Sequence, residues 1–374
     1  MTAEDDVHVW EPAKLSELRR LAKKWYSENG RDLPWRNTSD PYEIWVSEIM
    51  LQQTQVATVI PFYHRFLRSF PNVGALASAS LDEIYSHWAG LGYYRRARQL
   101  HQAAQQVQTK HAGVFPTDYK SVSELPGVGR YTAGAVLSFS SDQRFPIVEA
   151  NTQRLYARLL RLMQETSSKT AQLHLWSFAE RVLPSRSGSG NLNQAFMEMG
   201  SQVCVPKNPL CLICPVKTLC PTFASGLQAT IPAPKRPKEY TDLREVALVI
   251  RDSKGRMLMR RCTSEERWAG LWDFPRFDVT QCKSAGSQTR AVAEQFQARF
   301  GQKLIVGPKI HELKHSVTRY RISLNAYEAE IDSVADCTLE TSFETKWVIA
   351  SNKLELALNA SGQKLWLWIC KVCD

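Results

Sequence analysis

Two carboxylates in this sequence have neighbours that would give them opposite protonation states. The first, Glu48, lies in the run WVSEIMLQ, with the apolar side chains of Trp45 and Leu51 one helical turn away on either side. Apolar surroundings disfavour a charged carboxyl and raise its pKa, so such a group can donate a proton to a leaving group near neutral pH. The alternative for Glu48 is an ordinary glutamate at a solvent-facing helix edge.

The second carboxylate, Glu149, comes two residues before Asn151, a typical helix-capping residue, and an amphipathic segment follows. A helix N-terminus stabilises an anion, so we expect Glu149 to stay ionised. Cleavage of a glycosidic bond through an oxocarbenium-like state requires one neutral and one charged carboxyl. Glu48 and Glu149 are therefore predicted to line one cavity and to act together in breaking such a bond.

A glycine-rich turn, LPGVG at 125–129, leads directly into a helix-like segment that begins at Arg130. Gly127 and Gly129 permit a tight turn and a close approach of the backbone to a ligand. The unpaired amides at the start of the next helix carry partial positive charge and can hold a phosphate. Beside Glu149, such a phosphate seat indicates chemistry on a nucleic acid. The alternative is a plain corner between two helices of an all-α core.

Four of the nine cysteines lie within 17 residues, in the spacing Cys204-x6-Cys211-x2-Cys214-x5-Cys220. Clustered thiols of this kind indicate a set of metal ligands in a reducing compartment rather than a disulfide framework. One short pair flanked by longer spacings favours an iron–sulfur cluster, because structural zinc sites more often use two C-x2-C pairs. A zinc-dependent DNA-binding module is the alternative. The CKVC sequence at the C-terminal end lacks partner ligands, and we treat it as incidental.

Two loop segments combine side chains that can contact a base. Trp35 and Arg36 can stack on a base and bond to its edge, although Trp35 can equally be a core side chain. Gln53 and Thr54 belong to an uncharged polar cluster at the end of a helix predicted at 41–56. Such a cluster suits insertion into a base stack and hydrogen bonding to an exposed base edge.

A third segment of this kind, YYRRAR, begins at Tyr93, directly after the loop 90–92. Aromatic side chains followed by arginines can form an element that stacks on bases and contacts phosphates. The alternative is a solvated basic face above a tyrosine anchor.

The composition is that of a globular protein with a basic balance. Its 374 residues are 44% hydrophobic and 22% charged, with a net charge of +10 and a pI of about 9.1, which favours a polyanionic partner. The N-terminus has no apolar segment of a secretory signal, and no run of about 18 apolar residues indicates a membrane span. We expect a cytoplasmic protein that associates with the nucleoid.

The hydrophobic periodicity divides the chain into two domains. Residues 1–225, with an amphipathic helix at 13–30 and the cysteine loop at 204–220, show helical periodicity. The segment 226–242 is rich in proline and lysine and is predicted to be a linker. In 243–374, short strands alternate apolar and polar residues around a single helix-like stretch, which predicts a small α/β domain.

The motifs WVSEIMLQQTQV, GLGYYRRAR, LPGVGRYTAG and the cysteine spacing together resemble the helix-hairpin-helix DNA glycosylases, and within them the MutY-type adenine DNA glycosylases. This resemblance covers residues 30–225, and WAGLWDFPRF extends it over 240–374, which is similar to the Nudix-like recognition domain of that family. It implies an all-α helix-hairpin-helix glycosylase core with an iron–sulfur cluster loop, plus a C-terminal α/β Nudix-like domain. It further implies a monomer that binds double-stranded DNA and hydrolyses the N-glycosidic bond of an adenine opposite 8-oxoguanine or guanine.

The resemblance also implies roles for single residues. Glu48 would be the proton donor to adenine, while Glu149, Tyr131 and Asn151 would support the cationic transition state. The four cysteines would hold a [4Fe–4S] cluster. The implied contacts to DNA are Trp35, Arg36, Leu51, Gln53, Thr54, Leu91, Tyr93, Gly127, Gly129, Arg130, Thr318 and Arg319.

Three departures from the family pattern bear on these roles. Glu149 stands where the family has Asp, which adds one methylene near the sugar and leaves a mismatch-binding protein with impaired cleavage as an alternative. Val317-Thr318-Arg319 stands where the family has the Phe-Ser-His loop that reads 8-oxoguanine. The segment TRAVAEQFQARFG lacks the clustered glutamates that hold Mg²⁺ in a Nudix hydrolase, so we expect the C-terminal domain to be a reader.

The remaining rival is a bifunctional glycosylase/lyase of the endonuclease III type. Lyase chemistry needs a lysine nucleophile just after the hairpin, and Tyr131 stands at that position. A monofunctional enzyme without strong lyase activity is therefore expected.

Overall fold

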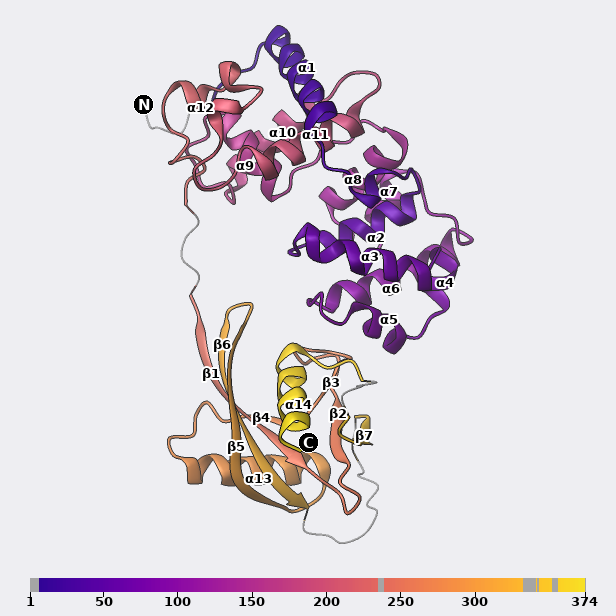
Figure 1. The fold of residues 1–374 in the computed structure, drawn as a ribbon, viewed down its shortest axis with the longest axis vertical. Helices are drawn as coiled ribbons and strands as arrows, with labels where there is room; N and C mark the ends of the chain where they lie inside the picture. Colours follow the sequence, from indigo (N-terminus) through magenta and orange to yellow (C-terminus); the bar gives the residue numbers. More distant parts are fainter. Residues whose placement is uncertain (1–6, 235–238, 332–340, 342, 352–355, 374) are drawn as a thin grey trace. The chain divides into compact units, whose positions relative to one another are not determined.

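The computed structural model describes residues 7–234, 239–331, 341, 343–351 and 356–373 (Figure 1). The chain separates into two compact units, and each is described by itself. The first unit comprises residues 1–79 and 96–236, and the second comprises 80–95 and 237–374. Among the described residues, no helix combines the length and the apolar composition that a membrane span needs.

The first unit is built of helices, which confirms the predicted all-α core. Its elements are α1 (Pro12–Asn29), η1 (Pro34–Arg36), α2 (Pro41–Leu51), α3 (Val56–Ser69), α4 (Val73–Ser78), α6 (Arg95–Lys110), α7 (Tyr119–Ser123), α8 (Arg130–Ser141), α9 (Ala150–Leu159), α10 (Lys169–Val182), α11 (Ser189–Gln202), η2 (Cys211–Ile213), η3 (Lys217–Leu219) and α12 (Pro221–Ala224).

Helix α2 begins as its sequence predicts but ends earlier. Asp40 caps its start by accepting the backbone N–H of Tyr42 at 2.8 Å, with Pro41 in the first turn. The helix stops at Leu51, so the predicted continuation to residue 56 is wrong. Gln53 adopts the left-handed φ of 57°, which a continuous right-handed helix cannot include. The polar cluster 52–55 therefore forms a loop between α2 and α3.

Five helices pack together in the centre of this unit. Helix α2 packs on α8, α8 packs on α11, and α11 packs on both α1 and α9. The core between α1, α9, α10 and α11 includes the fully buried side chains of Trp10, Tyr156 and Phe196. A packed core holds its helices rigidly, so the side chains at the ends of α2, α8, α9 and α11 have fixed positions.

The end of this unit includes part of the segment predicted to be a linker. Ile231 is buried in the helical core, and Nε of Arg158 donates to its carbonyl oxygen at 2.8 Å. These contacts extend the packed structure to residue 231. The boundary at 225 and the linker 226–242 stay predictions.

The second unit contains two β-sheets, which confirms the predicted α/β architecture of the C-terminal part. Its elements are α5 (Leu81–Trp88), β1 (Thr241–Ile250), β2 (Met257–Arg261), β3 (Trp272–Asp273), β4 (Arg276–Asp278), α13 (Ala285–Phe300), β5 (Leu304–Val317), β6 (Tyr320–Ile331), β7 (Thr345–Val348) and α14 (Ala360–Cys373).

The larger sheet has the order β4-β1-β6-β5 and is covered by a helix on each face (Figure 1). Strands β1 and β6 are parallel, and the other pairs in this sheet are antiparallel. Val246 and Leu248 of β1 pack with α13, whereas Ala247 and Val249 pack with α14. This period of two follows from the alternation of side chains across a strand. The smaller sheet has the order β3-β2-β7.

Candidate active site

A cavity of about 610 Å³ lies in the helical unit, and it brings together the two carboxylates that the sequence singles out. Glu48 comes from α2, Tyr131 from α8, and Glu149 and Asn151 from the start of α9. Seven of the predicted DNA contacts also line this cavity, namely Trp35, Arg36, Leu51, Gln53, Thr54, Gly127 and Gly129.

Glu48 is buried, with only 3% of its surface exposed. The hydroxyl of Tyr131 donates a hydrogen bond to its Oε2 at 2.6 Å. Burial raises the pKa of Glu48 to about 7, and the nearby carboxylate of Glu149 acts in the same direction, while the Tyr131 hydrogen bond opposes the rise. Glu48 can therefore hold a proton near neutral pH, which is the property of a general acid.

Glu149 is the N-cap of α9. Its two carboxylate oxygens accept the backbone N–H groups of Asn151 and Thr152, each at 2.8 Å. The hydroxyl of Thr152 in turn accepts the N–H of Glu149 at 2.9 Å, which completes a capping box. The expectation that Asn151 is the cap is therefore wrong, because the helix begins one residue before Asn151, at Ala150.

The pKa of Glu149 shifts in the direction opposite to the sequence-based expectation. Burial raises the pKa of Glu149, although the N–H groups of Asn151 and Thr152 and the charge of Arg154 act to lower it. The cost of desolvating the carboxylate thus exceeds the stabilisation by the helix N-terminus. Glu48 and Glu149 therefore both have raised pKa values, whereas the sequence led us to expect a raised pKa for Glu48 alone.

Tyr131 is held by a partner on another helix, and Asn151 by a partner on its own helix, α9. Burial, together with the Glu48 and Glu149 carboxylates, raises the pKa of Tyr131, so its hydroxyl stays protonated and donates to Glu48. The side-chain oxygen of Asn151 accepts from Nη2 of Arg154 at 2.9 Å. Gly200 of α11 lies so close to Asn151 that a Cβ there would be 2.7 Å from the Asn151 carbonyl oxygen.

Glu198 of α11 is a third buried carboxyl of the cavity, which sequence reasoning missed together with Arg31. Arg31 donates to it at 2.6 and 3.0 Å, and Arg36 donates at 2.7 Å. Although burial opposes it, these hydrogen bonds lower the pKa of Glu198 to about 2. The signal was available, because Glu198 stands in FMEMG among apolar residues, as Glu48 does in WVSEIML.

Trp35 and Arg36, which the sequence suggested as contacts to a base, both have partners within the protein. Trp35 is buried against Tyr63, with ring centroids 5.5 Å apart, so it is a core side chain that also forms part of the cavity wall. Arg36 donates to Glu198 and to the carbonyl of Arg31 at 3.0 Å. Both Nη atoms of its guanidinium therefore already donate to acceptors of the protein.

The glycine-rich turn is as tight as its sequence predicts, and its role as a phosphate seat stays a prediction. Gly127 has a φ of 78°, and a Cβ there would lie 2.9 Å from the Gln99 side chain. Gly129 is the N-cap of α8 and supplies no side-chain cap to its first amides. The guanidinium of Arg130 stacks on Trp176, 3.8 Å from the ring centroid.

Four predicted DNA contacts belong to the second unit, and their roles stay predictions. Leu91 is buried, whereas Tyr93 is 55% exposed. Thr318 and Arg319 form the exposed turn between β5 and β6. The hydroxyl of Thr318 donates to the carbonyl of Val317 at 2.7 Å, and Arg319 lies over the ring of Tyr320.

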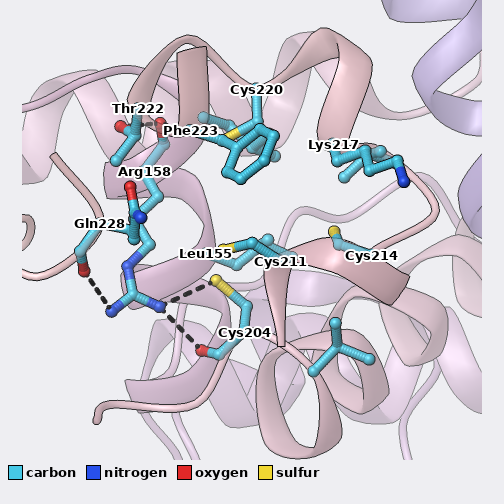
Figure 2. A pocket seen from close by; sticks show the side chains of 13 residues that line it. Leu155, Arg158, Cys204, Cys211, Cys214, Lys217, Cys220, Thr222, Phe223 and Gln228 are labelled. Carbon is cyan, nitrogen blue, oxygen red and sulfur yellow. Dashed lines mark hydrogen bonds between the residues drawn. The ribbon is translucent and has the colours of Figure 1, made fainter. Parts of the chain in front are cut away.

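The four clustered cysteines line a second cavity of the helical unit. Figure 2 shows the side chains of Cys204, Cys211, Cys214 and Cys220 around this space. Its wall also contains apolar side chains, and Nη1 of Arg158 donates to Sγ of Cys204 at 3.2 Å. Across the described part of the chain, no three His, Cys, Asp or Glu side chains converge closely enough to hold one metal ion. The sulfurs thus surround a space instead of meeting at a point.

Comparison with known proteins assigns the two parts of the chain to families. Residues 46–181 match the HhH-GPD superfamily of base excision DNA repair proteins, and residues 246–368 match the NUDIX domain. The adenine DNA glycosylase of Buchnera aphidicola subsp. Schizaphis graminum is 36% identical, over 70% of this chain and 75% of that protein.

The chain belongs to the adenine DNA glycosylase family.

The mouse adenine DNA glycosylase is 39% identical over 71% of this chain, which spans about half of that longer protein. A solved thermostable thymine-DNA glycosylase aligns with a TM-score of 0.52 and 27% identity, over 57% of this chain and 98% of its own. An endonuclease III–DNA complex aligns with a TM-score of 0.50 and 18% identity, over 59% of this chain and all of that one, which shows a shared fold.

Membership in the adenine DNA glycosylase family confirms the resemblance drawn from the motifs. It also confirms the expectation of a base excision repair enzyme that breaks an N-glycosyl bond, with a helix-hairpin-helix core and a Nudix-like C-terminal domain.

Proposed function

We propose that this chain hydrolyses the N-glycosidic bond of an adenine that lies opposite 8-oxoguanine or guanine in double-stranded DNA. The observation that carries the proposal is the buried Glu48, with a pKa of about 7 and a hydrogen bond to Tyr131, on the wall of a cavity that it shares with Glu149. The cavity is open to a base that is rotated out of the duplex, as base excision enzymes require.

In the proposed reaction, Glu48 gives its proton to a ring nitrogen of the extruded adenine. Protonation turns the base into a better leaving group, and the glycosidic bond breaks with positive charge developing on the sugar. The Glu149 carboxylate, with Tyr131 and Asn151, stabilises that cation. A water molecule then adds to the sugar and returns a proton to Glu48, which leaves an abasic site and free adenine.

Attack on the sugar by water, rather than by an amine of the protein, makes the proposed enzyme monofunctional. The described residues that line the cavity include no lysine, and Tyr131 follows the glycine-rich turn. A lyase needs an amine that forms a Schiff base with the sugar. Borohydride reduction during the reaction should therefore trap little covalent enzyme–DNA product, and abundant trapping would overturn this part of the proposal.

We infer that Cys204, Cys211, Cys214 and Cys220 hold a [4Fe–4S] cluster. The sulfurs enclose a space with apolar walls, and the positive charge of Arg158 beside Cys204 suits thiolate ligands. A bound cluster would cross-link the 204–220 loop, which carries the exposed Lys207 and Lys217. Iron and sulfide analysis with visible absorbance tests this, and zinc in place of iron would refute it.

We further propose that the Nudix-like domain reads 8-oxoguanine through the turn at Thr318 and Arg319, without hydrolysing nucleotides. Helix α13 has one glutamate, Glu294, where a magnesium site needs several. The protein is proposed to work as a monomer, in the cytoplasm at the nucleoid.

Single-turnover cleavage of a duplex with one adenine opposite 8-oxoguanine is the deciding test. Wild-type protein should release the base, and binding without cleavage would favour the alternative of a mismatch-binding protein. That alternative has one observation in its favour, because both carboxylate oxygens of Glu149 are occupied by the capping of α9. A Glu149→Asp variant much faster than wild type would show that the longer side chain impairs the chemistry.

A further inference from the structure

Arg96 is buried, although it lies in the basic segment that follows Tyr93. Its Nη1 donates to the carbonyl oxygens of Ile49 at 2.9 Å, Met50 at 2.8 Å and Gln52 at 2.5 Å. Its Nη2 donates to the hydroxyl of Thr54 at 3.1 Å. The arginine is therefore neither a phosphate contact nor part of a solvated face.

These bonds complete the C-terminal end of α2, the helix that carries Glu48. The last carbonyls of a helix lack partners within it, and a cation is favourable there. Arg96 satisfies the carbonyls of Ile49 and Met50, while the N–H of Thr54 bonds to the carbonyl of Leu51 at 3.3 Å. A side chain of α6 thus fixes where α2 stops.

The same guanidinium holds the turn that follows the helix. Gln53 has a φ of 57°, a conformation that is unfavourable for a residue with a side chain. The bonds from Arg96 reach Gln52 on one side of it and Thr54 on the other. Gln53 is exposed and lines the cavity of Glu48. A strained turn persists when the structure around it over-determines it, and such turns cluster at ligand contacts.

We propose that Arg96 is a positioning residue that presets the 52–54 turn as the wedge that opens the base stack around the target adenine. This inference rests on the proposed function, because the wedge acts only if the protein binds duplex DNA as its substrate. A wedge ordered before binding lowers the entropy cost of extruding the base. Arginine is required because its planar fork reaches four acceptors, whereas the ammonium of lysine is a compact point charge.

The test compares two duplexes that contain the same adenine:8-oxoguanine pair. In the first, all flanking bases are paired, and in the second, thymine:thymine mismatches flank the target so that the stack is already weakened. Arg96→Met should lower the single-turnover rate about 30-fold on the first duplex and only about 3-fold on the second. Arg96→Lys should lie between Arg96→Met and wild type. Arg68→Met, which removes an exposed arginine of α3, is the matched control and should change neither rate.

Equal losses on both duplexes would overturn the inference, because Arg96 would then act only on the fold or on the chemical step. Unchanged rates in both arginine variants would also overturn it. If Arg96→Met does not fold, as judged by thermal melting, Arg96→Lys carries the same comparison. Failure of wild-type protein to cleave either duplex would count against the proposed function alone. In that case, a 2-aminopurine base placed next to the target tests the wedge. The increase in its fluorescence when the protein binds the duplex should be smaller for Arg96→Lys than for wild type.

Discussion

Glu48 and Glu198 line the same cavity and are both buried, yet their pKa values shift in opposite directions. Glu48 is 3% exposed and Glu198 is 1% exposed. Burial raises the pKa of Glu48 to about 7, whereas, against burial, Arg31 and Arg36 lower the pKa of Glu198 to about 2. Burial alone therefore does not decide protonation here. The neighbour decides, because Glu48 has a neutral phenol and Glu198 has two guanidinium groups.

Replacing Glu48 is the strongest test of this comparison between the two carboxyls. Glu48→Gln keeps the size of the side chain but cannot supply the proton, so the single-turnover rate should fall by about 10²–10⁴-fold. Affinity for the adenine:8-oxoguanine duplex, measured by fluorescence anisotropy, should stay within a few-fold of wild type. A variant that keeps its rate would show that another group protonates the base.

Removing the other carboxyl should affect stability more than chemistry. Glu198→Gln leaves Arg31 and Arg36 without their anion, and breaking a buried ion pair is costly. Because Arg31 is partly exposed, we expect a loss of about 2–3 kcal/mol in the free energy of unfolding, measured with urea. The matched control is Glu180→Gln, at an exposed carboxyl of α10, which should cost much less. Comparable losses of stability in the two variants would contradict a stabilising ion pair between Glu198 and the two arginines.

The two carboxyls should also give opposite dependences of stability on pH. The folded pKa of Glu48 lies above its ordinary value of 4.5, so the native state binds more protons than the unfolded state between pH 4.5 and about 7. The contribution of Glu48 to the free energy of unfolding falls by about 3 kcal/mol as pH rises through that window. Glu48→Gln should remove this dependence on pH. The folded pKa of Glu198 is depressed, so its contribution is present above pH 4.5 and is lost as pH falls towards about 2. Urea unfolding of both variants across pH measures each contribution.

The smallest expected effect concerns the hydroxyl of Tyr131. Its hydrogen bond lowers the pKa of Glu48 against the effect of burial. In Tyr131→Phe, the pKa of Glu48 should therefore rise, and the alkaline limb of the pH–rate profile should move up by about one pH unit. A limb that moves down, or stays in place while the rate falls, would mean that Glu48 does not control that limb.

The sequence predicted what depends on local pattern. The helical core, the α/β part and the environment of Glu48 followed from periodicity and from apolar neighbours one turn away. The sequence predicted that Glu149 shares a cavity with Glu48, and the family resemblance implied the place of Tyr131. The helix start at 130 was visible as a turn signal, whereas the cap of the next helix was assigned to Asn151 instead of Glu149.

The contacts that the sequence did not predict are between residues far apart in the chain. Glu198 and Arg31 are 167 positions apart in the chain. Arg96 bonds to residues at the end of α2 that lie up to 47 positions before it. Periodicity shows which residues are buried, but not which distant charge they meet. The early end of α2 was missed for the same reason, since its terminating partner comes from another helix. The raised pKa of Glu149 depends on tertiary burial, which a capping signal does not report.

The close approach of Gly200 to Asn151 makes the spacing between α11 and the start of α9 intolerant of a single added methyl group. Even alanine at position 200 would press on the peptide that bears Asn151 and tilt the turn that Glu149 caps. A residue that takes no part in proton transfer thus sets the distance between α11 and the start of α9, where Glu149 lines the cavity.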